Sequence, residues 1–189
     1  MSLKHAILGF LSFRPLSGYN LKKAFDHSVQ HFWSANQSQI YRTLAQMDEE
    51  GFVEKQVVER EERLDMKIYS ITEAGRDELH RWLSTPLPEQ DDREPILIQV
   101  YFAGVLNDDE ILNLLQTYLK ATEERLAVYK SVFQMARSIP NEGIEERTIF
   151  LSMLTLEAGF KTNQAIADWL QSSIQRIQQK KYLIDISEK

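Results

Sequence analysis

The segment 52–72 constrains the fold more than any other part of the chain. It is rich in Val, Ile and Tyr, and the polar run REERLD divides it in two. Two such runs around a polar stretch are typical of a β-hairpin, and we expect strands at Val53–Glu59 and Met66–Ile71. Elsewhere the apolar residues recur at the three- and four-residue spacing of helices. The chain is therefore predicted to be mainly α, with a two-stranded hairpin.

Helical patterns flank this hairpin. Before it, residues 3–13 carry apolar side chains at helical spacing, Ser17 can cap a second helix, and 34–51 is predicted to be a third helix that ends at Gly51. After it, Thr72 can cap a short fourth helix. This order is that of a winged helix-turn-helix domain, in which the third helix is the recognition element and the hairpin is the wing.

The chain changes character at PLPEQDDREP, residues 86–95, which holds three of the five prolines and four acidic residues. This composition is typical of a linker. The helices predicted beyond it are Ile96–Leu106, Glu110–Ser138 with Asp108 as its cap, and Ile144–Tyr182. We therefore predict three parts: a winged helix-turn-helix domain at 1–85, the linker at 86–95, and an all-helical dimerisation domain at 96–189.

The last predicted helix carries an apolar stripe near its end, formed by Trp169, Leu170, Ile174 and Ile177. Three helices offer little surface to cover a stripe of this length. A second copy of the chain would cover it, so these four residues are the predicted homodimer interface.

One face of the third helix differs sharply from the other. At 100° per residue, Ile40, Leu44 and Met47 form a core stripe. Ser38 and Arg42 lie near the opposite pole, together with other hydrogen-bonding side chains. Such a face, close to a helix start, suits the major groove of DNA, where Arg can pair with guanine and Gln or Asn with adenine. The other interpretation is that this is only the solvated face of a core helix.

The distribution of charge favours the first interpretation. The whole chain has a formal net charge of −6. The segment Met1–Met47, however, holds five basic residues and one acid, a net charge of +4. Charges further than about 10 Å away are largely screened, so a locally basic face on an acidic protein can still bind phosphate.

Several other classes of function are disfavoured. The chain has no cysteine, which excludes disulfides, zinc–thiolate sites and thiol nucleophiles. No nucleophile elbow or phosphate-binding glycine loop occurs, so no enzyme and no cofactor are predicted. His27 and His31 have the spacing of a metal pair but no evident third ligand, so no metal site is predicted.

The apolar run at the start of the chain is too short to span a membrane and has no signal-peptide pattern, so we expect a cytoplasmic protein that is not membrane-bound. Aromatic residues are plentiful, and a small aromatic effector could bind where the two domains meet. Core packing explains most of these aromatic residues equally well. No effector-binding residue can be named from the sequence.

Four motifs together resemble the PadR family of bacterial transcriptional regulators. They are GY-L at Gly18, Tyr19 and Leu21, IY--L at Ile40, Tyr41 and Leu44, the turn EEGFVE, and ITEAGR. The resemblance is close over residues 3–84. The linker and the helical part are similar in layout to longer members, whose C-terminal dimerisation domain is of the virulence activator-like kind.

This resemblance implies a homodimer that binds a roughly palindromic operator in double-stranded DNA, usually as a repressor released by a small effector. It also implies that Tyr19 and Tyr41 lie at the DNA. The DNA-binding residues that we predict are Tyr19, Lys22, Lys23, Asn36, Gln37, Ser38, Gln39, Tyr41, Arg42, Arg63 and Lys67.

The predicted wing departs from the family pattern. Family members often carry a tip rich in Gly, Arg and Lys, whereas here the tip REERLDMK together with the preceding Glu59 has three basic and four acidic residues. Acidic side chains beside phosphates are repulsive. Contact between the wing and DNA is therefore left open, and so is an alternative function as an effector-binding or scaffolding protein with weakened DNA binding.

Overall fold

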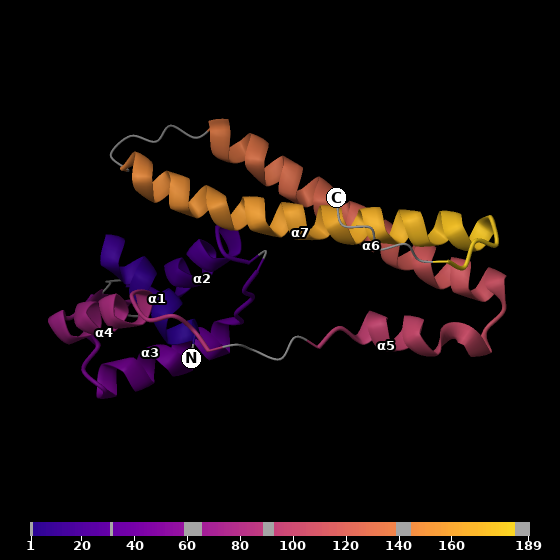
Figure 1. The fold of residues 1–189 in the computed structure, drawn as a ribbon. Helices are drawn as coiled ribbons and strands as arrows, with labels where there is room; N and C mark the ends of the chain where they lie inside the picture. Colours follow the sequence, from indigo (N-terminus) through magenta and orange to yellow (C-terminus); the bar gives the residue numbers. More distant parts are fainter. Residues whose placement is uncertain (1, 31, 59–65, 89–92, 139–144, 184–189) are drawn as a thin grey trace. The chain divides into compact units, whose positions relative to one another are not determined.

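A computed structural model describes residues 2–30, 32–58, 66–88, 93–138 and 145–183. The chain forms two units, Met1–Gln90 (unit 1) and Asp91–Lys189 (unit 2). Helices dominate both units (Figure 1), which confirms the predicted mainly α fold. The boundary between the units falls inside the predicted linker 86–95.

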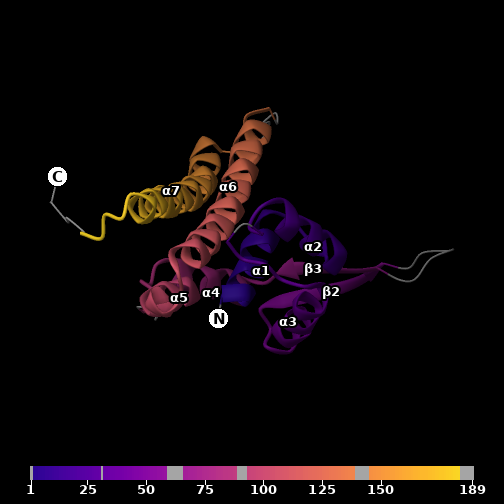
Figure 2. The same ribbon diagram turned by 90° about the vertical axis from the view of Figure 1, so that its right-hand side faces the viewer.

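The described residues of unit 1 form four helices and a small sheet, whose elements are seen in Figure 2. Its elements are α1 (Ser2–Phe13), β1 (Leu16–Ser17), α2 (Gly18–His27), α3 (Gln37–Glu49), β2 (Val53–Val58), β3 (Met66–Ile71) and α4 (Glu73–Leu83). The sheet is antiparallel with the order β1-β3-β2. The predicted two-stranded hairpin is confirmed, and β1 adds a third strand that the sequence analysis did not predict. Strand β1 has two residues, too few to show a period of two in the sequence.

The core of unit 1 lies among α1, α2, α3 and the sheet. Ile40, Leu44 and Met47 are buried, as their helical spacing predicted, and they pack with Leu8 and Leu21. This packing fixes which face of α3 points outward.

The predicted helix caps at Ser17 and Thr72 are confirmed. The Ser17 hydroxyl accepts a hydrogen bond from the Asn20 amide at 3.2 Å, and the Thr72 hydroxyl accepts one from the Gly75 amide at 3.1 Å. Gly51 has φ +74°, the left-handed conformation expected after a helix. Helix α3 begins at Gln37, three residues later than the predicted start at 34, because Asn36 caps it.

Unit 2 consists of helices. They are α5 (Pro95–Phe102), the 3-10 turn η1 (Ala103–Val105), α6 (Asp108–Ser138) and α7 (Glu146–Gln178). The long helices α6 and α7 run side by side (Figure 1). Asp108 is the first residue of α6 and not its cap. Asn107 is the cap, because its side-chain oxygen accepts a hydrogen bond from the Glu110 amide while the Glu110 carboxylate accepts one from the Asn107 amide.

The apolar stripe of α7 is covered within the chain itself. Leu170 is 0% exposed and Ile174 is 8% exposed, and both pack with Leu115 of α6. Trp169 and Ile177 are partly buried against the same cluster. The expectation that a second copy covers Leu170 and Ile174 was wrong, because α5 and α6 cover both residues within the chain. The assignment of Trp169 and Ile177 to a homodimer interface stays a prediction. Leu170 in particular has no surface left for a partner.

Candidate nucleic-acid interface

The outward face of α3 is polar and exposed. Ser38, Arg42 and Gln46 are exposed on the face of the helix that lies opposite its buried residues, and Gln37 is exposed at the first position of the helix. Ala45 is also exposed and leaves this face without bulk. Ser38 lies in the first turn, where backbone N–H groups have no acceptor within the helix. The face can therefore donate hydrogen bonds from its backbone, from Arg42 and from amide side chains.

Two of the predicted DNA-binding residues hold the start of α3 in place. The Asn36 side-chain oxygen accepts a hydrogen bond from the Gln39 amide at 2.9 Å, and the Gln39 side-chain oxygen accepts one from the Asn36 amide at 2.9 Å. This reciprocal pair is a capping box. Each side-chain oxygen thus already accepts one hydrogen bond, which fixes the position of the amide group at the start of the helix.

Tyr41 links α3 to the start of α2. A Cβ atom added to Gly18 would lie 2.5 Å from Cε1 of Tyr41, well inside van der Waals contact. The Tyr41 ring thus rests on the bare backbone of Gly18, and 40% of the tyrosine stays exposed. This contact gives a physical reason for glycine in the GY-L motif and for tyrosine in the IY--L motif.

The exposed side of α2 adds an aromatic and a cationic group. Tyr19 is 56% exposed, and the Lys23 Nζ lies 4.7 Å from the centre of its ring. This cation–π contact favours an outward position for both side chains. Lys22 forms an ion pair with Asp26 on the same helix, so its positive charge is partly offset. Lys23 is the stronger candidate of the two for a phosphate contact.

The wing is described except for its tip. Lys67 is exposed on β3, opposite Val57 of β2. Lys55 on β2 forms an ion pair with Asp48 near the end of α3, and the hydrogen bond to Asp48 raises the pKa of Lys55. This ion pair ties β2 to the end of α3. Arg63 and the rest of the predicted tip lie outside the described residues.

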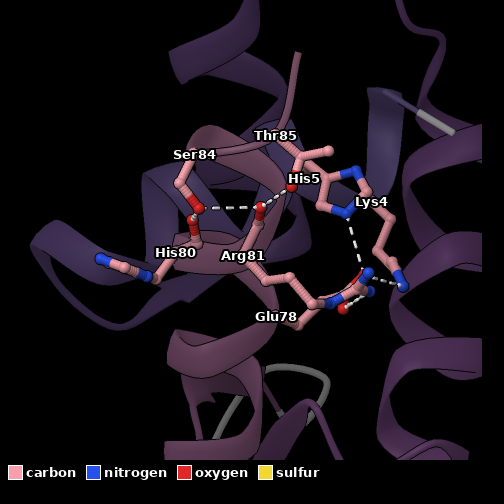
Figure 3. Close-up of polar contacts among 7 residues, drawn as sticks. All are labelled: Lys4, His5, Glu78, His80, Arg81, Ser84 and Thr85. Carbon is pink, nitrogen blue, oxygen red and sulfur yellow. Dashed lines mark hydrogen bonds and ion pairs between the residues drawn. The ribbon is translucent and has the colours of Figure 1, made fainter. Parts of the chain in front are cut away.

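A polar cluster that sequence reasoning missed joins α1 to α4 (Figure 3). The Glu78 Oε1 accepts from Lys4 Nζ at 2.8 Å and lies 3.0 Å from His5 Nε2, while Oε2 pairs with Arg81. Hydrogen bonds from Lys4, Arg81 and His5 lower the pKa of Glu78 from 4.5 to about 2. His5 also stacks on Trp82, with ring centres 4.5 Å apart. One of the basic residues counted in the N-terminal segment therefore has a structural role.

Two side-chain hydroxyl groups cap the C-terminal end of α4 beside this cluster (Figure 3). The Ser84 hydroxyl donates to the His80 carbonyl at 2.9 Å, and the Thr85 hydroxyl donates to the Arg81 carbonyl at 2.7 Å. These bonds satisfy carbonyls that the helix itself leaves without a donor. The helix that carries Glu78 thus ends in a defined way.

The described residues contain neither a cluster of metal ligands nor a membrane-spanning helix. No group of three His, Cys, Asp or Glu side chains is close enough there to hold a metal ion. Within the same residues, no helix is both long enough and apolar enough to cross a membrane.

The chain matches two family models. Residues 7–81 match the transcriptional regulator PadR-like family, and residues 93–178 match the virulence activator alpha C-terminal family. The negative transcriptional regulator PadR of Bacillus subtilis is 29% identical over 93% of this chain and 97% of its own length. A probable transcriptional regulator of Mycobacterium tuberculosis is 31% identical over 96% of this chain and 100% of its own length.

Solved structures agree with these matches. The crystal structure of Bacillus subtilis PadR in complex with operator DNA superposes with a TM-score of 0.79 at 30% identity, covering 94% of this chain and 99% of that one. The structure of the same protein in complex with p-coumaric acid gives a TM-score of 0.78 at 28% identity, covering 93% of this chain and 95% of that one.

Proposed function

The chain belongs to the PadR-like family of transcriptional regulators, and from this premise we propose that it is a homodimeric repressor that binds a palindromic operator through α3 and is released by a small effector. The observation that carries the proposal is the polar, exposed face of α3, flanked by Tyr19, Lys23 and Tyr41 on a winged-helix scaffold. The complex of Bacillus subtilis PadR with operator DNA supports it.

The geometry divides the predicted DNA-binding residues by role. Arg42 and Ser38 are the side chains we assign to base edges and nearby phosphates, because they are exposed on the outward face of α3. Gln37, exposed at the first position of the helix, is assigned to a nearby phosphate. Tyr19, Tyr41 and Lys23 are assigned to the backbone of the duplex. Asn36 and Gln39 act as positioning residues, since their capping box sets where the first turn of α3 begins.

The experiment is a fluorescence anisotropy titration of the full-length protein with DNA from its own promoter. Arg42→Ala should cost roughly 1–3 kcal/mol of binding free energy and relax selectivity at one base pair if Arg42 reads a base. An equal loss of binding free energy on every DNA sequence would identify Arg42 as a phosphate contact instead. Arg147→Ala, which removes an exposed arginine from unit 2, is the matched control and should bind as the unchanged protein does.

Salt dependence separates this function from the effector-binding or scaffolding alternative. Each neutralised phosphate contributes about −0.9 to the slope of log K against log[salt] on duplex DNA, so a true operator complex should weaken steeply. Absence of any sequence-selective binding at low salt would refute the repressor proposal and leave the alternative.

The homodimer is supported by apolar side chains that unit 2 leaves exposed. Tyr101, Phe102 and Val105, in and after α5, are 82%, 66% and 90% exposed, and Phe150 and Leu154 on α7 are 60% and 40% exposed. Exposed apolar surface of this kind marks interaction sites. We assign it to a second copy of the chain, since the stripe at Leu170 and Ile174 is buried.

Light scattering on two double variants tests this assignment. Phe150→Glu with Leu154→Glu, and separately Ile98→Glu with Tyr101→Glu, place charges on the two exposed regions without touching the core. At least one pair should give monomers, because a buried unpaired charge destabilises an interface strongly. If both stay dimeric, the interface is elsewhere.

The effector part of the proposal is supported by the complex of Bacillus subtilis PadR with p-coumaric acid, a small aromatic acid. Its test is a repeat of the promoter titration with that acid present. Release of the DNA by the acid, with no change in the salt dependence of the remaining DNA binding, would support the effector part of the proposal.

A further inference from the structure

We infer that strand β2 of unit 1 is an interaction surface for a second copy of the chain, which pairs with it antiparallel through its own β2. In the sheet order β1-β3-β2 this strand lies at an edge, and all six of its residues pair with β3. Figure 2 shows β2 and β3 extending past the helices of unit 1. The inference needs the proposed function only for its consequence on DNA.

The hydrogen bonds of the hairpin show which backbone groups of β2 are directed away from β3. The Thr72 amide donates to the Phe52 carbonyl at 3.1 Å. This bond makes Val53 and Ile71, which lie opposite each other, a pair that exchanges no hydrogen bonds of its own. Hydrogen-bonded and non-hydrogen-bonded pairs alternate along an antiparallel ladder. Every second residue of β2, beginning with Val53, therefore directs its N–H and C=O groups toward the free edge.

Lys55 and Val57 carry these groups in the exposed part of the strand. Val53 is buried, whereas the Lys55 side chain is 46% exposed and Val57 is 49% exposed. Within the described part of the chain, no backbone group outside the sheet donates to or accepts from Lys55 or Val57. Unpaired N–H and C=O groups along an exposed edge are a template for another strand. The strand can therefore accept a partner there.

A two-fold axis through Gln56 gives a register that suits both copies. Lys55 then lies opposite Val57 of the second copy, and each of these two equivalent pairs exchanges both of its hydrogen bonds. An axis through Lys55 would instead place two lysines directly opposite each other, which is repulsive. An axis through Val57 would pair only Gln56, Val57 and Val58 of the described strand. The register centred on Gln56 pairs five residues, Glu54 to Val58, and is the one we assign.

The side chains are compatible with this register. On one face the Gln56 amide can donate to Glu54 of the second copy, its diagonal neighbour. On the other face the two Lys55 side chains are diagonal neighbours, but each already forms an ion pair with Asp48 of its own chain. A free lysine at an edge deters strand pairing. The ion pair with Asp48 offsets this charge, and the exposed Val57 gains apolar contact.

The size of the contact determines where it forms. Five paired residues on each copy bury much less than the roughly 1,200 Å² of a stable specific interface. Pairing is therefore weak between freely diffusing molecules and becomes populated when two copies are held close together. Two homodimers bound to neighbouring operator sites would be held in this way. Pairing of their β2 strands would make their DNA binding cooperative.

The test uses disulfide cross-linking of the full-length protein without DNA, because the chain contains no cysteine of its own. In the assigned register the Cα atoms of two Gln56→Cys residues lie about 4.5 Å apart, within the range of a disulfide. Glu54→Cys changes an exposed residue on the same face of β2 and is the matched control. Its two copies are about 13 Å apart along the strands. With oxidised glutathione, Gln56→Cys should form covalent dimers about tenfold faster or more.

A proline at Val57 tests whether the backbone of the free edge is responsible. Val57→Pro removes an outward N–H and leaves the bonds to β3 in place, and edge strands tolerate proline in this position. Added to Gln56→Cys, it should reduce cross-linking to the rate of the Glu54→Cys control. Val57→Thr keeps the donor and the branched shape and should preserve the faster rate. Thermal unfolding of both variants is measured in parallel.

A second pair of positions tests the register without proline. Glu54 lies opposite Val58 of the second copy, so a chain with both Glu54→Cys and Val58→Cys should form covalent dimers, although neither single variant does. Equal cross-linking rates at Gln56→Cys and Glu54→Cys, or a double variant no faster than the single ones, would overturn the inference. Cross-linking in a protein that fails to bind promoter DNA would refute the repressor proposal and leave the pairing of β2 intact.

Discussion

Replacement of Glu78 by glutamine should lower the stability of the fold at neutral pH and remove part of its pH dependence. The Glu78 carboxylate accepts hydrogen bonds from Lys4 and His5 of α1 and from Arg81 of α4. The Glu78 side chain is only 10% exposed. Glutamine keeps the shape but not the charge. The variant therefore isolates the electrostatic part of the contact between the first and last helices of unit 1 (Figure 3).

The magnitude follows from the pKa of Glu78, which falls from 4.5 to about 2 in the folded chain. Each unit of pKa corresponds to about 1.4 kcal/mol, which sets a ceiling of roughly 3 kcal/mol. Arg81 is 72% exposed and Lys4 is 21% exposed, so solvent screens much of this interaction. We expect Glu78→Gln to lower the free energy of unfolding at pH 7 by about 1–2 kcal/mol.

The sign of the pH dependence is fixed by the direction of this shift. Because the folded pKa lies below 4.5, the unfolded chain binds more protons between pH 4.5 and 2, and stability rises with pH across that window. The contribution is complete above pH 4.5 and is lost as the pH falls toward 2. At pH 3.5 roughly two-fifths of it should be gone. The difference in free energy of unfolding between the unchanged protein and Glu78→Gln should therefore decrease as the pH is lowered from 7 to 3.5.

Urea denaturation followed by circular dichroism at pH 7, 5 and 3.5 measures this gap. All samples are kept at one protein concentration because dimerisation contributes to apparent stability. Asp77→Asn removes a carboxylate from the neighbouring, exposed position of α4 and serves as the control. A gap that does not change from pH 7 to pH 3.5, or a Glu78→Gln variant no less stable at pH 7 than Asp77→Asn, would refute this account of the cluster.

Three further predictions concern backbone positions and the start of α3. Gly75→Ala should lower the free energy of unfolding by about 2 kcal/mol, because the added Cβ would lie 2.2 Å from the Phe52 carbonyl oxygen. Gly9→Ala should raise the free energy of unfolding by about 0.5–1 kcal/mol, because no atom lies within 4 Å of the added Cβ. Equal changes in melting temperature for Gly75→Ala and Gly9→Ala would contradict this pair of predictions. Lys180→Gly should stabilise unit 2 by about 1 kcal/mol, because it removes a side chain from a left-handed position. The melting temperature of the full chain should therefore rise, and an unchanged or lower melting temperature would contradict this prediction. Asn36→Ala should cost about 1 kcal/mol of stability and weaken DNA binding, whereas Asn36→Ser should retain most of both; equal behaviour of the two in urea titrations would argue against the cap.

The fold of unit 1 was largely predictable because its signals are local. The spacing of Ile40, Leu44 and Met47 identified the buried side of α3, and Ser17 and Thr72 were correctly identified as helix caps. Strand β1 was missed because its pairing with β3 joins residues about fifty positions apart and leaves no local pattern. The Glu78 cluster was missed for the same reason, since its members belong to α1 and α4.

The prediction for Leu170 and Ile174 of α7 was wrong because a sequence pattern does not identify what covers an apolar stripe. Leu170 and Ile174 were assigned to a partner on the assumption that three helices could not cover them. In the structure α5 lies against the same cluster through Ile96 and Val100 and supplies the missing surface. The exposed apolar surface is instead around Tyr101 and at the start of α7, where the helical period alone does not distinguish core from interface.

The polar start of α3 illustrates how a single stretch of sequence can carry two functions at once. Asn36 and Gln39 are hydrogen-bonded to each other's amides and so determine where the helix begins. Tyr41 rests on Gly18 and so determines how α3 lies against α2. Together with the buried Ile40, Leu44 and Met47, these contacts hold the face that carries Ser38 and Arg42 in one position. A helix needs this rigidity to place an arginine within hydrogen-bond distance of one base pair and not its neighbour, because a misplacement of about 1 Å is enough to lose a bidentate contact. The side chains that make the interface precise are therefore different from those that we expect to touch the bases.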